Sequence, residues 1–143
     1  LALARQIQTH RRALTVIAFS TGARSFELHP DELGLSQLAR FLGGSFHGGT
    51  DLRPALDEAL RVLEMQAFSH ADVLVISDFR VPKIADRFVE RIKQQQGRGT
   101  LFHSLTIARG AVRDPLNIFD HSWLFNISEG VRGIDEDTLR MLV

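Results

Sequence analysis

An amphipathic helical repeat followed by a short apolar run in the middle of the chain sharply limits the folds open to it. Leucines recur there at helical spacing, with alanines beside them: Leu52, Ala55, Leu56, Ala59, Leu60 and Leu63. This pattern predicts a helix with one apolar face. The run that follows, Val73–Ser77, is apolar without alternation, which is typical of a buried strand in a parallel sheet. Together they predict an α/β fold.

The same alternation of strand and helix signals continues on both sides of this unit. A strand is predicted over Ala13–Phe19, and Ser25–Leu28 predicts a short half-exposed edge strand that pairs back as a hairpin. Further strands are predicted over 100–107 and 121–127, and further helices over 1–9, 35–42, 84–96 and 135–143. The order predicts one α/β domain over residues 1–143, with a mostly parallel sheet covered by helices on both faces.

Composition excludes several classes of protein. Of the 143 residues, 44% are hydrophobic and 24% are charged, which is typical of a globular domain. The formal net charge is zero, so no overall field favours nucleic acid. There is no cysteine and no apolar span of about 18 residues, so we expect no transmembrane segment and a cytoplasmic location. Because the chain starts at Leu1 instead of Met, we expect an amino-terminally truncated fragment.

Two points in the sequence together suggest a metal site. Thr50 precedes the central helix, and Asp78 follows the apolar strand, so both are expected at the carboxyl ends of strands, where open α/β sheets bind ligands. Hydroxyl and carboxylate oxygens are the ligands that Mg2+, Mn2+ and Ca2+ prefer. Gly48 and Gly49 would let the backbone bend tightly there. Asp51 is better placed to cap the helix or hold a metal-bound water than to be a direct ligand.

Other interpretations of these residues remain open. A Gly-Gly-Thr-Asp segment before a helix is most often only a loop and an N-cap, supplied by Thr50 or Asp51. Phe79 and Arg80 follow Asp78 and are either partner contacts or solvent-facing loop residues. The six histidines show no paired spacing, so zinc is not expected.

The segments Phe46–Leu52 and Val75–Phe79 resemble the second and third metal-binding segments of von Willebrand factor A (VWA) domains. The strand that ends at Ala18–Thr21 is similar to the segment after the first helix of that family. The tail Ile118–Trp123 resembles the carboxyl-terminal VWA domain of ViaA-type bacterial proteins, whose partner is a MoxR-class AAA+ ATPase.

The resemblance implies a Rossmann-like, doubly wound sheet and a metal-ion-dependent adhesion site that holds a divalent cation, usually Mg2+. Thr50 matches the family's threonine ligand, and Asp78 matches its aspartate, which often acts through water. The family's first motif, Asp-x-Ser-x-Ser, and its central first strand have no counterpart here. We therefore expect weak or absent metal binding and unpaired strand edges, completed by a separate segment or by dimerisation.

Two functions from different classes follow. The first is a non-enzymatic, metal-dependent protein-binding module, an adaptor for a MoxR-class AAA+ ATPase, as the resemblance implies. The alternative is a Mg2+-dependent phosphoryl-transfer or receiver-like domain with Asp78 as the acceptor. The chain has no Asp-x-Asp pair, and its lysines, Lys83 and Lys93, both follow Asp78 closely in sequence, which weighs against the alternative.

Overall fold

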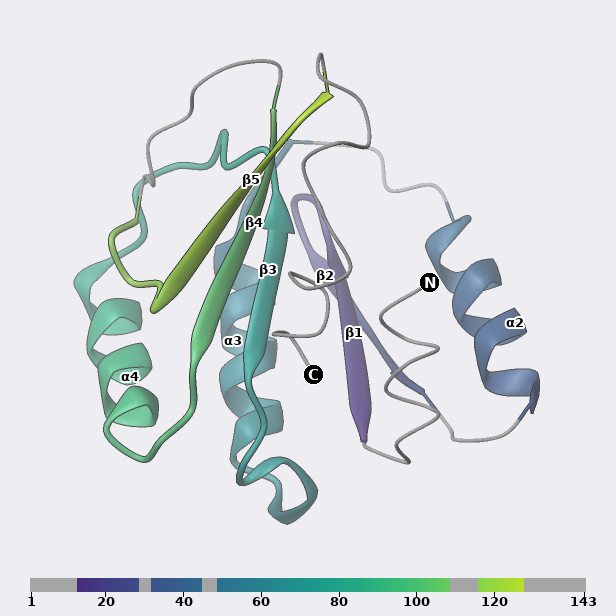
Figure 1. Ribbon diagram of the computed structural model, residues 1–143, viewed down its shortest axis with the longest axis horizontal. Helices are drawn as coiled ribbons and strands as arrows, with labels where there is room; N and C mark the ends of the chain where they lie inside the picture. Colours follow the sequence, from purple (N-terminus) through teal and green to yellow (C-terminus); the bar gives the residue numbers. More distant parts are fainter. Residues whose placement is uncertain (1–12, 29–31, 45–48, 109–115, 128–143) are drawn as a thin grey trace.

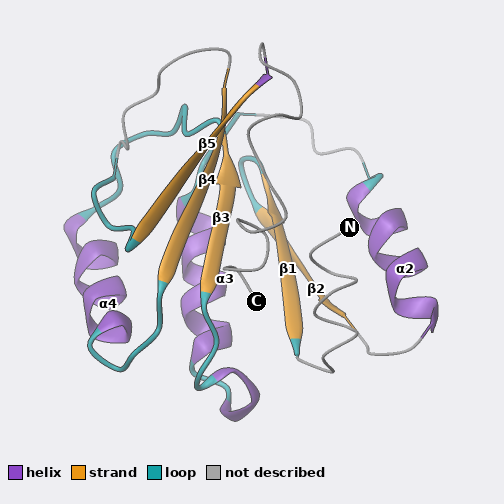
Figure 2. Ribbon diagram, viewed as in Figure 1, coloured by secondary structure: helices purple, strands orange, loops and turns teal. Residues whose placement is uncertain are grey.

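A computed structural model describes residues 13–28, 32–44, 49–108 and 116–127 (Figure 1). Its elements, in chain order, are β1 (Leu14–Phe19), β2 (Ala23–Leu28), α2 (Glu32–Leu42), α3 (Arg53–Leu63), the short 3-10 helix η1 (Gln66–Phe68), β3 (Val73–Ser77), α4 (Asp86–Gln96), β4 (Phe102–Ala108) and β5 (His121–Asn126). Figure 2 shows the alternation of helices and strands that the sequence predicts. The helices predicted over 1–9 and 135–143 lie outside the described residues.

The strands form two sheets. β1 and β2 form an antiparallel hairpin with Leu14 opposite Leu28, which confirms the predicted hairpin. β3, β4 and β5 are parallel, with Val73 opposite Phe102 and His103 opposite His121. The mostly parallel sheet is therefore confirmed.

The two sheets lie side by side and leave strand edges unpaired. Figure 1 shows β1 and β3 as the neighbouring strands of the two sheets, and within the described ranges no strand pairs with both. Val73–Ser77 is the predicted strand, but of its residues only Val75 is buried, and Ile76 is 47% exposed. The prediction of a buried strand is corrected, because Ile76 points to the face of β3 opposite Val75, and it is Val75 that packs against α3 and α4. The unpaired edges agree with our expectation for a sheet that lacks its central strand.

Helix α3 connects the two sheets through its apolar face. Leu52, Leu56 and Leu60 are at most 2% exposed and belong to the same core cluster as Val75 and Phe102 of the parallel sheet. Apolar residues of the hairpin pack against this cluster: Ile17, Phe19 and Ala23. One helix face therefore buries parts of both sheets, as the leucine spacing predicts.

The other helices complete the layers. α4 lies beside α3 and adds Phe88 and Ile92 to the core, while Arg91 forms an ion pair with Asp57 at 3.0 Å. α2 packs against the other face of the hairpin, where Leu38 joins Leu28. In the described residues α3 and α4 lie on one side of the parallel sheet and α2 lies on the other side of the hairpin, and this mixed α/β arrangement confirms the predicted fold class. None of the helices in the described part of the chain is long and apolar enough to cross a membrane.

The bounds of two predicted helices need correction. The helix predicted over 35–42 begins earlier, at Glu32, and its last residue, Leu42, is 46% exposed. α4 starts at Asp86, so Ile84 precedes the helix although its side chain is buried. Asp51 caps the start of α3, as predicted, because its Oδ1 accepts the N–H of Arg53 at 3.0 Å, while Leu52 between them already has helical dihedral angles. Pro54 does occupy the first turn of α3, where its missing N–H costs nothing.

Because the apolar face of α3 lies in the core, shortening one of its leucines should destabilise the protein. Leu56→Ala should lower the free energy of unfolding by about 2–5 kcal/mol, because a cavity would open where the helix contacts both sheets. Leu42→Ala is the matched control and should change it by less than about 0.5 kcal/mol, since Leu42 is exposed. Urea unfolding followed by circular dichroism measures both. Equal losses for the two variants would contradict this description of the core.

Candidate functional site

Three loops lie at the end of the molecule where β1 and β3 terminate (Figure 1). They are the hairpin turn Ser20–Gly22, the segment 49–52 before α3, and the segment 78–82 after β3, and we call them the carboxyl-end loops. The first two are bonded directly, since the N–H of Asp51 donates to the carbonyl of Ser20 at 2.7 Å. The structure therefore places Thr50 and Asp78 at the same end of the sheets, as the sequence predicts for ligands of an open α/β sheet.

Gly49 and Thr50 lie beside the hairpin turn. A Cβ built on Gly49 would come within 3.8 Å of the Thr21 methyl carbon, an ordinary contact, and the φ of Gly49 is outside the left-handed region. The backbone at Gly49 would therefore accept a side chain. Thr50 is half-buried. Gly48 lies outside the described residues.

Asp51 is held by its neighbour Arg53. Its Oδ1 accepts the Arg53 backbone N–H at 3.0 Å and the Nε–H at 2.9 Å, and its Oδ2 accepts from Nη2 at 2.6 Å. These hydrogen bonds from Arg53 lower the pKa of the Asp51 carboxyl below its usual value. Both carboxylate oxygens are already engaged, which agrees with the expectation that Asp51 is not a direct ligand.

Asp78 is more open. Its Oδ1 accepts the backbone N–H of Arg80 at 3.1 Å, and its Oδ2 lies 4.0 Å from the Arg80 Nε. The Asp78 side chain is 47% exposed and that of Arg80 is 88% exposed. The carboxylate thus keeps acceptor positions that face water, and Arg80 is free to reach a partner.

Phe79 turns the other way. It has a positive φ of 52°, it is 5% exposed, and its ring meets Phe119 edge to face at 5.5 Å. The hydroxyl of Ser77 accepts the Phe79 N–H at 3.1 Å. The expectation of a solvent- or partner-facing Phe79 is therefore corrected, because burial of the ring offsets the cost of this backbone conformation. The turn sends Phe79 into the core and leaves the side chains on either side of it exposed.

The donor set fits a divalent cation in kind but not in number. Thr50 and Asp78 supply hard oxygen donors of the type that Mg2+ binds, and such an ion keeps several waters in weak sites. Within the described residues, no group of three or more His, Cys, Asp or Glu side chains could hold a metal ion. These residues alone would therefore hold a cation weakly.

Sequence reasoning missed an aromatic cluster across β4 and β5. The rings of His103 and His121 stack with centroids 5.2 Å apart, and Trp123 lies 5.5 Å from His103. Trp123 is half-buried. His103 is 6% exposed, and its Nδ1 has no hydrogen-bond partner among the described residues. The pair arises from the strand register, which residue spacing does not reveal.

The fold is similar to that of a solved structure. The chain is similar in structure to an aerotolerance-related membrane protein from Bacteroides fragilis, with a TM-score of 0.55 over 99% of this chain and 72% of that one. Sequence identity is 18%, so this likeness shows the α/β fold alone. The chain matches no protein-family model.

Similarity in sequence points to one group of bacterial proteins. The chain is 35% identical over 127 residues to the regulatory protein ViaA of Proteus mirabilis. It is 33% identical over 127 residues to that of Photorhabdus laumondii and 32% identical over 136 residues to that of Edwardsiella ictaluri. These matches cover 88–93% of this chain but only 26–27% of the relatives. The chain thus spans about a quarter of the length of these relatives, which are named as regulatory proteins.

The buried His103 predicts a pH dependence. Burial away from water lowers its pKa below the usual 6.5, so the folded state binds a proton less readily than the unfolded chain. Stability should therefore fall as the pH drops below about 6.5. In urea unfolding between pH 8 and pH 5, His103→Gln should flatten this dependence.

The matched control is His70→Gln, since His70 is exposed; that variant should keep the pH dependence of the parent. If His103→Gln and the parent lose the same stability over this range, His103 is not the titrating group.

Proposed function

We propose that this chain is a non-enzymatic protein-binding module of the VWA type that acts as a regulatory adaptor. One structural observation carries the proposal: the Asp78 carboxylate is 47% exposed directly after β3, at the end of the molecule where the segment 49–52 is bonded to the hairpin turn that follows β1. The similarity to proteins named as regulatory supports a regulatory role.

The proposed contact combines a cation and a partner. Thr50 and Asp78 would hold Mg2+, or Mn2+ in its place, and a carboxylate of the partner would complete the coordination. The cation would neutralise charge between the two carboxylates, so neither side would bind strongly without it. Arg80, which is 88% exposed beside Asp78, would add a second contact to an acidic partner surface.

The proposed partner is a MoxR-class AAA+ ATPase, and the support for it is the resemblance of this chain to ViaA-type proteins. The ligands that the described residues lack would come from the family's first motif, and a central strand between β1 and β3 would carry that motif. Both features are proposals for the complete protein.

Calorimetry tests the metal site. Titration of Mn2+ into the chain should give weak binding, with a Kd of roughly a millimolar, and the double variant Thr50→Ala, Asp78→Ala should abolish the heat. Glu90→Gln is the matched control, since Glu90 is exposed on α4 away from the carboxyl-end loops. Absence of heat with the parent chain, or equal heat with the double variant, would refute the metal site.

The proposal also predicts that Asp78 is not a phosphoryl acceptor. A receiver-like site requires a lysine from a later strand beside the acceptor, whereas Lys83 lies in the loop after β3 and Lys93 lies on α4, both exposed. Incubation with acetyl phosphate and Mg2+ should leave the intact mass unchanged. A phosphorylated parent chain, together with an unmodified Asp78→Asn variant, would favour the enzymatic alternative.

A further inference from the structure

The outer edge of β2 opens into a groove. β2 pairs with β1 only, so its other side presents backbone N–H and C=O groups that no described strand pairs with. A groove of about 650 Å³ is lined there by three successive residues, Ala23, Arg24 and Ser25. Since successive residues of a strand point to opposite faces, a groove that touches all three runs along the edge of the strand.

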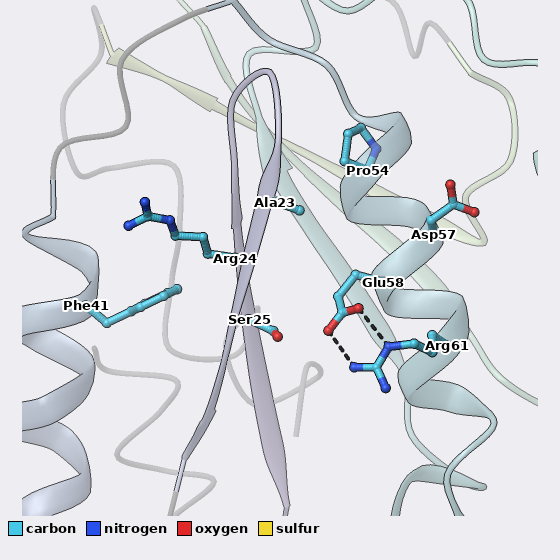
Figure 3. A pocket seen from close by; sticks show the side chains of 8 residues that line it. All are labelled: Ala23, Arg24, Ser25, Phe41, Pro54, Asp57, Glu58 and Arg61. Atoms are coloured by element: carbon cyan, nitrogen blue, oxygen red, sulfur yellow. Dashed lines mark hydrogen bonds and ion pairs between the residues drawn. The ribbon is translucent and has the colours of Figure 1, made fainter.

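Helices wall this groove on both sides, and we call it the β2 groove. Figure 3 shows α2 on one side of the hairpin and α3 on the other. Phe41 of α2 forms one wall and stacks on Phe26 of β2 with ring centroids 5.4 Å apart. Pro54 and Glu58 of α3 contribute to the opposite wall. The strand edge thus forms the floor of a slot, the arrangement in which an extended peptide can add a strand to a sheet.

The charges along the groove are unevenly compensated. On the α3 wall, Glu58 accepts hydrogen bonds from Arg61 at 2.8 and 2.7 Å, and Asp57 is paired with Arg91 at 3.0 Å. On the other wall Arg24 is exposed, and no carboxylate of the described residues pairs with it. Arg24 is therefore the charged side chain of the groove lining that has no ion-pair partner among the described residues, and it favours a ligand that carries a carboxylate.

We propose that the β2 groove binds an extended segment of a partner protein, which pairs with β2 through its main chain and places a carboxylate side chain against Arg24. This binding would be independent of a metal ion and separate from the contact at the carboxyl-end loops. The strand edge would supply affinity, and Arg24 with Phe41 would select an acidic side chain next to an apolar one.

Synthetic peptides test the main-chain pairing. The probe is a fluorescein-labelled ten-residue peptide of alternating valine and threonine with one central glutamate, titrated in EDTA and followed by fluorescence anisotropy. Two further peptides of the same sequence, called the twins, carry N-methyl groups on the backbone, one on its odd residues and the other on its even residues. Since only one set of N–H groups faces the β2 edge, one twin should bind about tenfold or more weakly, while the other should bind like the parent peptide.

Arg24 is tested by exchanging charges. A peptide with lysine in place of glutamate should bind roughly three- to tenfold more weakly, and Arg24→Glu should reverse this preference. Arg98→Glu is the matched control, an exposed arginine outside the groove, and should leave the preference unchanged. Because EDTA is present, failure of the metal site would not affect these results.

Hydrogen exchange shows where the peptide binds. Peptide addition should protect amides of β2 within 23–28, while β5, the other outer strand, should stay unprotected. Equal binding by both N-methylated twins, protection confined to β5, or a groove occupied by a second copy of the chain in native mass spectrometry would each overturn the proposal.

Discussion

The structure depends on burial of one face of α3 against both sheets. Leu52, Leu56 and Leu60 share a core with the parallel sheet, and the hairpin packs against the same cluster. At about 25 cal/mol for each square ångström of apolar surface, such a face is the main favourable contribution available to this part of the chain. In the described residues no backbone hydrogen bonds join β1 to β3, so the two sheets are held together by their contacts with α3.

This constraint also positions the candidate site. α3 begins directly after Thr50 and Asp51, and the N–H of Asp51 is bonded to the hairpin turn. On the other side, burial of Phe79 fixes the turn after β3 and leaves Asp78 exposed. The core therefore holds two of the carboxyl-end loops, 49–52 and 78–82, from beneath, a requirement for any site whose ligands come from separate loops.

The sequence predicted the architecture well and the environment of single residues less well. Periodicity located Val73–Ser77 and the hairpin because period and turn signals are local. The environment of a single residue depends on which neighbours pack against its strand, and local sequence patterns do not reveal those neighbours. This is why the sequence did not predict the burial of Phe79, the exposure of Ile76 or the stacking of His103 on His121. Thr50 and Asp78 were placed at the same end because strand direction alone decides it.

Paramagnetic broadening by Mn2+ would test the central claim most directly. In two-dimensional NMR spectra of the chain, substoichiometric Mn2+ should selectively broaden the amide signals of Thr50, Asp78 and Arg80. This broadening should disappear in the double variant Thr50→Ala, Asp78→Ala. Broadening centred instead on other acidic surface residues such as Asp57 and Glu64, or no selective broadening at all, would contradict a metal site at the carboxyl-end loops.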